Sequence, residues 1–186
     1  MRVIAGTERG RKLFAPPGVT TRPTSDRVKE ALFSILASQI DFTDIRVLDI
    51  CAGTGSLGIE ALSRGAGSCS FIECNLSVKA ILEKNLLVTG GQDRSEIVSM
   101  DAVKALKVFT GRGQHFDLAF FDPPYDAELY QQVIEALDAD TLLTPGSILV
   151  AECSVRNPLS ESYGKLKRFD RRVYGETALE LFIQEE

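Results

Sequence analysis

The sequence predicts an α/β fold with a doubly wound, mostly parallel seven-stranded sheet, an antiparallel C-terminal hairpin, and a small N-terminal extension of a β-hairpin and a helix. From Arg46 onward, short apolar strands alternate with amphipathic helices, and parallel strands need such helical crossovers. Two strand patterns near the C-terminus follow each other with no helix between them, which predicts the hairpin. The chain has 186 residues, of which 44% are hydrophobic and 25% charged, as in an ordinary soluble globular domain.

The N-terminal extension is predicted to span residues 1–40, ahead of a main domain at residues 41–186. Glycines and prolines mark turns around two short strands, Arg2–Ala5 and Arg11–Phe14. The next element is a helix with Thr24 or Ser25 as its expected cap. Its apolar stripe has helical spacing and consists of Val28, Ala31, Leu32, Ile35 and Leu36.

The main domain is predicted to alternate between strands and helices up to its closing hairpin. The expected strands are Arg46–Ile50, Ser68–Glu73, Glu96–Ser99, Phe116–Phe121, Ser147–Ala151, Lys165–Tyr174 and Ala178–Gln184. The expected helices are Ser56–Arg64, a helix capped by Asn75 with the stripe Val78, Ile81, Leu82, Asn85 and Leu86, then Ala102–Phe109 and Glu128–Leu137. Ligands on such sheets bind at the carboxyl ends of the strands, so chemistry is expected after residues 50, 73, 99 and 121.

The distribution of charge is uneven. The net charge is −5, yet residues 1–30 hold seven Lys or Arg and only three acids. A basic arm on an acidic body suits a phosphate-rich partner gripped at one edge, although a solvated surface is the commoner meaning of a charge cluster.

Several classes of protein are not expected. The four cysteines form no C-x-x-C pair and the chain has one histidine, so no metal site is predicted and the cysteines are interpreted as reduced, buried residues of a cytoplasmic protein. No apolar run reaches the ~20 residues of a membrane-spanning helix. The N-terminus turns polar too early for a signal peptide.

The first strand of the main domain leads into a glycine-rich turn, Asp49-Ile50-Cys51-Ala52-Gly53-Thr54-Gly55-Ser56-Leu57-Gly58. Its glycines have the spacing G-x-G-x-x-G, which lets backbone approach a ligand closely at the start of a helix. A tight strand-to-helix turn without a ligand would give the same spacing. At this position in a parallel sheet we favour a nucleotide-like ligand.

Acids follow the next two strands. Glu73 lies 24 residues beyond Asp49 and is placed to accept both hydroxyls of a ribose, the alternative being an exposed acid. Asp101 could accept the exocyclic amine of an adenine, with the N–H of Ala102 beside it. Asp101 could equally cap the following helix, and the two roles are compatible.

The tetrapeptide Asp122-Pro123-Pro124-Tyr125 follows the fourth strand and is the most informative in the chain. Two prolines stiffen the backbone and remove two N–H donors, so the Asp122 carboxylate and the Pro123 carbonyl can accept from one planar NH₂ group. Tyr125 offers a ring for stacking an extruded base. A proline turn after a buried strand is the alternative.

Two ligand classes fit the glycine turn. A nicotinamide cofactor accounts for the glycines and Glu73 but not for Asp122–Tyr125. A methyl donor on the turn, facing an amine held by Asp122, accounts for both, because acceptors on its two hydrogens free the lone pair of a conjugated amine. Placing the methyl group in line with that amine would supply most of the catalysis.

With these segments the sequence resembles the class I S-adenosylmethionine-dependent methyltransferases, with their Rossmann-like sheet, and in particular the amino-methyltransferases with a D-P-P-Y motif. The match is closer to the RsmD family of 16S rRNA (guanine-N2) methyltransferases. The resemblance rests on residues 2–6 and 9–13, Thr21-Arg22-Pro23-Thr24, residues 26–33, the 49–58 turn, Asp122–Tyr125 and Tyr174-Gly175-Glu176-Thr177.

The resemblance implies methyl transfer from S-adenosyl-L-methionine to the exocyclic N2 of a guanine in 16S rRNA. The substrate would be the small ribosomal subunit or its assembly intermediate, and the enzyme a bacterial, cytoplasmic monomer without metal or membrane partner. Cofactor binding would fall to Asp49, Cys51, Ala52, Gly53, Gly55, Glu73, Asp101 and Ala102. The target amine and base would be held by Asp122, Pro123, Pro124 and Tyr125. RNA would be contacted by Arg9, Arg11, Lys12, Arg22, Pro23 and Thr24.

Two other functions stay open from the sequence. An adenine-N6 methyltransferase acting on DNA or RNA shares the D-P-P-Y motif, although 186 residues leave little room for the added domain with which DNA enzymes read sequence. A non-catalytic RNA-binding assembly factor on the same scaffold is the other, and the intact Asp122, Gly53 and Gly55 speak against it.

Overall fold

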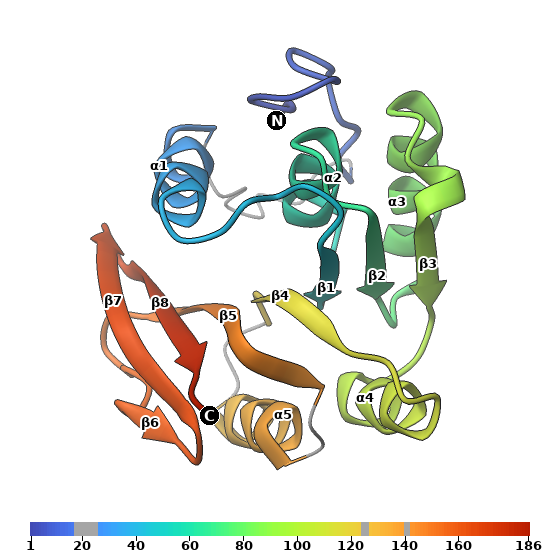
Figure 1. Ribbon diagram of the computed structural model, residues 1–186. Helices are drawn as coiled ribbons and strands as arrows, with labels where there is room; N and C mark the ends of the chain where they lie inside the picture. The colour runs from blue at the N-terminus through green and yellow to red at the C-terminus, as the bar shows by residue number, and fades with distance from the viewer. Residues whose placement is uncertain (17–25, 124–126, 140–141) are drawn as a thin grey trace.

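The computed structural model describes residues 1–16, 26–123, 127–139 and 142–186. Within them, eight strands form one sheet in the order β3-β2-β1-β4-β5-β8-β7-β6 (Figure 1). The strands are β1 Arg46–Ile50, β2 Ser68–Ile72, β3 Ser95–Val98, β4 Phe116–Phe121, β5 Leu143–Ser154, β6 Ser162–Tyr163, β7 Leu166–Tyr174 and β8 Thr177–Gln184. The first five in chain order run parallel, and β8 pairs antiparallel with both β5 and β7.

The predicted fold class is confirmed, but the strand count is eight rather than seven. The extra strand, β6, pairs only Ser162 and Tyr163 with β7 at the edge of the sheet. A two-residue strand has no periodicity that a sequence pattern could reveal.

The predicted N-terminal hairpin is present in a shorter form than expected, because the described residues hold a single antiparallel bridge, Arg2 to Lys12, in place of two strands. Its backbone bonds within the arm, from Val3 N–H to the Arg11 carbonyl at 2.9 Å and from Gly10 N–H to the Val3 carbonyl at 2.9 Å. It also bonds to α2, where the Glu60 carboxylate accepts the N–H groups of Ile4 and Ala5 at 2.8 and 3.0 Å. The N–H of Glu8 donates to Ser63 Oγ at 3.0 Å. We call residues 1–16 the N-terminal arm.

Helices cover both faces of the sheet, with α1, α2 and α3 on one side and α4 and α5 on the other (Figure 1). They span α1 Asp26–Ala37, α2 Ser56–Ser63, α3 Leu76–Val88, α4 Ala102–Gly111 and α5 Ala127–Ala139, with a short 3₁₀ helix at Gln92–Arg94. The predicted cap of α3 is confirmed, since Asn75 Oδ1 accepts the N–H groups of Ser77 and Val78. Thr24 and Ser25, the expected cap of α1, lie outside the described residues.

Successive side chains of each strand point to opposite faces of the sheet and belong to two separate hydrophobic cores. Leu48 and Phe121 pack with α4 and α5, whereas Val47 and Phe120 pack with α1, α2 and α3. Val3 and Leu13 of the arm belong to the second core. The arm is therefore packed into the body of the molecule. No helix among the described residues is long and apolar enough to cross a membrane.

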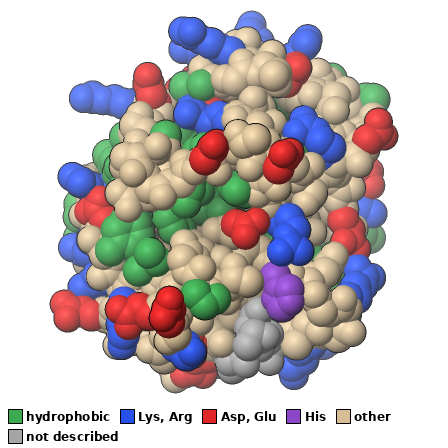
Figure 2. All heavy atoms as spheres, in the orientation of Figure 1, with side chains coloured by type: hydrophobic (Ala, Val, Ile, Leu, Met, Phe, Trp, Pro, Cys, Tyr) green, Lys and Arg blue, Asp and Glu red, His purple; other side chains and the backbone are tan. Residues whose placement is uncertain are grey.

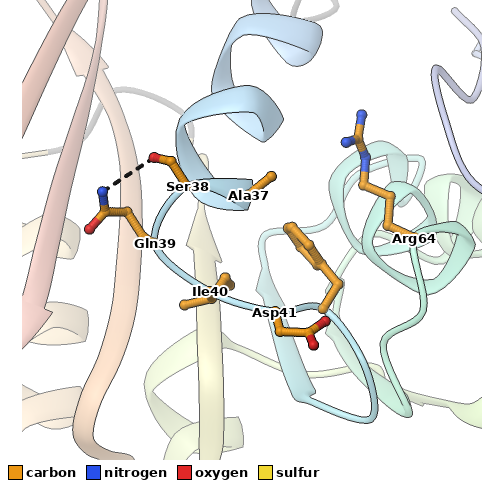
Figure 3. A pocket seen from close by; sticks show the side chains of 7 residues that line it. Ala37, Ser38, Gln39, Ile40, Asp41 and Arg64 are labelled. Atoms are coloured by element: carbon orange, nitrogen blue, oxygen red, sulfur yellow. Dashed lines mark hydrogen bonds between the residues drawn. The ribbon is translucent and has the colours of Figure 1, made fainter.

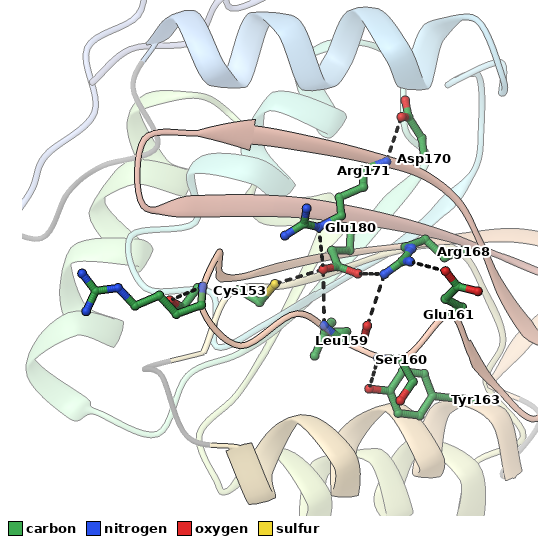
Figure 4. A network of polar contacts seen from close by, with 11 residues as sticks. Cys153, Leu159, Ser160, Glu161, Tyr163, Arg168, Asp170, Arg171 and Glu180 are labelled. Carbon is green, nitrogen blue, oxygen red and sulfur yellow. Dashed lines mark hydrogen bonds and ion pairs between the residues drawn. The ribbon is translucent and has the colours of Figure 1, made fainter.

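A buried ionic cluster, the Glu180 cluster, holds the C-terminal strands together (Figure 4). The Glu180 side chain is fully buried on β8, and its carboxylate accepts from Arg168 Nη1 at 2.7 Å and Arg171 Nε at 3.1 Å. It also accepts the N–H of Leu159 at 3.3 Å, so the loop after β5 is tied to β8.

The four cysteines are free thiols, but they are not all buried as predicted. Cys69 and Cys153 are buried and Cys51 is half-buried, whereas Cys74 is exposed because it lies in the loop between β2 and α3.

Candidate functional site

The carboxyl ends of β1, β2 and β4 meet at one edge of the sheet. Ile50, the last residue of β1, is paired with Ile72 of β2 on one side and Phe121 of β4 on the other. The glycine turn after β1, Glu73 after β2 and Asp122 after β4 are therefore neighbours, as the strand-end rule predicted.

The glycine turn is sharply bent. Cys51, Gly53 and Gly55 have positive φ values of 59°, 57° and 78°, and Cys51 carries a side chain in a conformation that costs about 1 kcal/mol. The turn is fastened by two backbone bonds, from Ala52 N–H to Ile72 at 2.9 Å and from Gly55 N–H to Ala52 at 2.8 Å.

The three glycines of the motif do different work. A Cβ at Gly53 would meet only the Cys51 carbonyl oxygen, at 4.0 Å, so a ligand has room to approach the backbone there. A Cβ at Gly55 would lie 2.3 Å from Leu82 Cδ1, and one at Gly58 would lie 2.4 Å from Phe71 Cε1. Glycine is therefore required at positions 55 and 58 by packing within the protein, whereas Gly53 is the position open to a ligand.

Asp49 supports the turn from within β1. Its side chain is buried, and Oδ2 accepts the N–H of Gly58 in the first turn of α2 at 2.9 Å. Burial raises the pKa of Asp49 to about 8, with the charges of Asp122 and Glu73 adding to the rise and the Gly58 N–H opposing it. Through this bond to Gly58, Asp49 fixes the start of α2 relative to β1.

Glu73 also contacts the turn. One carboxylate oxygen accepts the N–H of Gly53 at 2.9 Å and the other accepts the N–H of Asn75 at 2.7 Å. A carboxylate oxygen has a second acceptor direction, so both oxygens keep capacity for hydroxyl donors beside Gly53.

Asp101 caps α4, which was one of the two roles expected for it. Its side chain is exposed and accepts the N–H of Lys104 at 3.2 Å, while Ala102 is buried. The cap leaves the rest of the Asp101 carboxylate open to solvent after β3.

Asp122 is exposed at the end of β4, while its backbone N–H reaches Ile50 at 3.4 Å. The pKa of Asp122 is raised, because protein atoms crowd the carboxyl on most sides and the Glu152 carboxylate adds negative charge. The side chain nevertheless reaches solvent, as an amine acceptor must. Pro123 is buried, and Pro124 and Tyr125 lie outside the described residues.

The described part of the arm presents its predicted RNA-contact residues to solvent. Arg9, Arg11 and Lys12 are exposed, and Arg11 forms an ion pair of 3.3 Å with Glu8. They line a shallow hollow of about 400 Å³, and Figure 2 shows Lys and Arg side chains projecting at the top of the molecule, over this region. Arg22, Pro23 and Thr24 lie outside the described residues.

A second hollow, of about 450 Å³, lies at the opposite edge of the sheet (Figure 3). It is lined by residues 37–42, which lead into β1, and by Arg64, which ends α2. Because these residues adjoin the amino ends of the strands, this hollow is not where such a sheet binds its ligand.

The sequence analysis gave no role to three buried polar side chains around the turn. Lys29, Glu60 and Asn85 are each 0% exposed and hydrogen-bond to the arm or the turn. The signal that could have found them is a polar residue inside an apolar helical stripe, where burial requires a partner.

Comparisons with known proteins agree with this geometry. A family model described as "Conserved hypothetical protein 95" matches residues 1–183. Ribosomal RNA small subunit methyltransferase D of Escherichia coli is 35% identical over 185 residues, which cover 100% of this chain and 90% of that protein. Its Haemophilus influenzae counterpart is 38% identical over 160 residues, covering 86% and 81%. The chain belongs to this family, the RsmD family.

Solved structures place the RsmD-family chain in the same fold. The Escherichia coli protein yhhF, described as a candidate methyltransferase, has a TM-score of 0.86 and 34% identity, covering 100% of this chain and 98% of that one. Hypothetical protein TTHA0928 of Thermus thermophilus has a TM-score of 0.82 and 29% identity, covering 97% and 98%.

Proposed function

We propose that this RsmD-family chain transfers the methyl group of S-adenosyl-L-methionine to the exocyclic N2 amine of a guanine in 16S rRNA. The substrate is the small ribosomal subunit or its assembly intermediate, and the enzyme acts as a cytoplasmic monomer. One observation carries the proposal: the exposed Asp122 and the glycine turn extend from adjacent strand ends, joined by the bond from Asp122 N–H to Ile50. A methyl donor and a methyl acceptor can therefore meet between them.

The turn fits the proposed donor. Gly53 leaves open space, Glu73 beside it has acceptor capacity for the ribose hydroxyls, and Asp101 after β3 has capacity for the adenine amine. Glu73 and Asp122 form no ion pair with Lys or Arg in the described parts of the chain, so their negative charge suits a sulfonium cation. SMU.776, a protein of the same fold with a TM-score of 0.64 and 13% identity, was crystallised with SAH.

The bound donor supplies a methyl group on a positively charged sulfur. In the proposed reaction the Asp122 carboxylate and the Pro123 carbonyl accept the two amine hydrogens and turn the nitrogen lone pair toward the methyl carbon. The nitrogen–carbon bond forms as the carbon–sulfur bond breaks with its electron pair left on sulfur. One proton then leaves the nitrogen for Asp122, whose raised pKa suits a base near neutral pH.

The relatives' names and the arm support the substrate class. The Escherichia coli and Haemophilus influenzae relatives are named for the small-subunit ribosomal RNA. We propose that residues 1–40 form the RNA-contacting region, because the exposed Arg9, Arg11 and Lys12 can neutralise phosphates. Arg22, Pro23 and Thr24 would contact RNA near the mouth of the site, with Tyr125 stacking on the extruded base.

Labelled methyl transfer tests this function. The protein is incubated with methyl-labelled donor and either small subunits lacking the modification, naked 16S rRNA, or DNA, and the product is digested to nucleosides. We expect N2-methylguanosine from the subunits. N6-methyladenine would establish the rival amino-methyltransferase, and donor binding without transfer to any substrate would favour a non-catalytic assembly factor.

Asp122→Asn tests the role of the carboxylate. We expect turnover to fall by about 10² or more, because the side chain then presents an amide in place of a charged acceptor, with donor affinity changed less than about two-fold. In the unmodified protein, activity should fall as the pH drops through the raised pKa of Asp122, well above the usual carboxyl range. Asp93→Asn, an exposed acid in the 3₁₀ helix, is the matched control. Weaker donor binding with unchanged turnover at saturation would contradict the assignment.

A further inference from the structure

Asn85 connects the N-terminal arm to the glycine turn. It is fully buried on α3, and its Nδ2 donates to the carbonyl oxygens of Thr54 at 2.9 Å and Phe14 at 3.1 Å. Its Oδ1 accepts the N–H of Phe14 at 2.7 Å. One side chain thus binds both backbone groups of an arm residue and one backbone group of the turn.

Both hydrogen-bonding groups of the peptide unit between Thr54 and Gly55 have partners within the protein. Asn85 holds its carbonyl, while its N–H donates to Ala52 at 2.8 Å. Leu82, one turn earlier on α3, occupies the space where a Gly55 side chain would lie. The path of the turn past Gly53 therefore depends on α3 and on the amide of Asn85.

Lys29 makes a second connection on the other side of Gly55. Its buried ammonium donates to Ser56 Oγ at 3.2 Å and to the Arg2 carbonyl of the arm at 2.7 Å. It also pairs with Glu60 at 3.3 Å, and Glu60 accepts the N–H groups of Ile4 and Ala5. Burial lowers the pKa of Lys29, and Glu60 offsets part of that effect.

The arm consequently holds the residues on both sides of Gly55 through two fully buried side chains. A hydrophobic residue at position 85 would complete the apolar stripe of α3 at no desolvation cost, whereas a buried amide is tolerated because its partners satisfy it. Those partners are the arm and the turn.

We propose that Asn85 is a positioning residue of the methyl-donor site, through which the arm sets the shape of the glycine turn. RNA on the arm and donor on the turn then bind with positive coupling, each raising the affinity of the other by the same factor. This inference rests on the proposed function, which supplies the two ligands.

The experiment measures binding of S-adenosylhomocysteine, which cannot react, by calorimetry at a temperature well below unfolding. In Asn85→Ala we expect the affinity to fall about five-fold or more. Ser147→Ala is the matched control, since Ser147 is also buried and donates to the Phe116 carbonyl at 2.8 Å, far along the sheet from the turn. The affinity of Ser147→Ala for S-adenosylhomocysteine should be unchanged, even if its melting temperature falls as far as that of Asn85→Ala.

The second measurement needs no variant. With saturating small subunits present, the wild-type affinity for S-adenosylhomocysteine should rise, and the affinity for subunits should rise equally when S-adenosylhomocysteine is bound. In Asn85→Ala this factor should fall toward one, while Ser147→Ala keeps it. A wild-type protein that binds both ligands without coupling, or an Asn85→Ala variant with intact affinity and coupling, overturns the proposal. Failure of the wild type to bind S-adenosylhomocysteine would instead refute the proposed function.

Discussion

Acidic side chains are surrounded in opposite ways at two places in the molecule. In the Glu180 cluster, a fully buried carboxylate meets Arg168 and Arg171 (Figure 4). At the carboxyl ends of β1 and β4, Asp49 and Asp122 have no ion pair with Lys or Arg of the described residues, and both have raised pKa values. The first arrangement neutralises a buried charge within the protein, whereas in the second no Lys or Arg of the described residues stabilises the charged form of either acid, which a bound cation would do.

The difference teaches how to separate structural acids from functional ones. An acid in a crowded site without a cationic partner costs stability when it is charged, and such acids persist where a bound ligand or a reaction uses them. The three predictions below test whether the two regions behave in these different ways.

The largest effect is expected in the Glu180 cluster. Glu180→Ala should lower the free energy of unfolding by about 3 kcal/mol, because two arginines lose a buried partner and the N–H of Leu159 loses its acceptor. Urea unfolding measures the change, and S-adenosylhomocysteine affinity should stay the same. Glu161→Ala removes the exposed partner of Arg168 and should change stability by less than about 0.5 kcal/mol. Equal losses in both variants would contradict the distinction.

The next effect concerns Asp49 and pH. Its pKa of about 8 in the folded protein lies above the unfolded value of 3.8, so the folded state keeps a proton that the unfolded chain releases. Stability is therefore lost as the pH rises from about 4 to about 8. In Asp49→Asn, the loss of stability between pH 6 and pH 8 should shrink by about 2 kcal/mol. Unfolding curves at the two pH values measure it, and an unchanged difference would show that the charge of Asp49 is compensated.

The smallest effect is a change in ligand preference. S-adenosylmethionine is a sulfonium cation, whereas S-adenosylhomocysteine carries a neutral sulfur, so the uncompensated acids should favour the former. Glu73→Gln should reduce that preference by about 1 kcal/mol, because one negative charge near the turn is removed. The ratio of the two dissociation constants measures the effect and cancels any general damage to the turn. Glu83→Gln, on the exposed side of α3, should leave the ratio unchanged.

Much of the fold could be predicted from the sequence because local patterns determine it. The strands before Phe121 are short apolar runs followed by helical stripes, and the structure places them within a few residues of the predicted bounds. β5 begins at Leu143 rather than Ser147, because Pro145 and Gly146 interrupt the apolar pattern where the pairing with β4 shifts register. Such an irregularity depends on the partner strand, which sequence periodicity cannot show.

The candidate site likewise has features that the sequence could predict and features that it could not. The strand-end rule predicted that Glu73, Asp122 and the glycine turn would be neighbours, since it depends only on topology. It could not show that Leu82 fills the space beside Gly55, or that Asn85 binds Phe14, because these contacts join segments up to 71 residues apart. Pairwise contacts of that kind require coordinates.

The place of β8 has a consequence for biosynthesis. This strand, Thr177–Gln184, inserts between β5 and β7, so β5 waits for a partner that the ribosome makes more than twenty residues later. Until then a nascent chain exposes one edge of β5 and the apolar side chains that β8 will cover. The sheet is thus completed from its middle, and the synthesis of β8, rather than the formation of the first strands, sets the moment at which the open edge of β5 is covered.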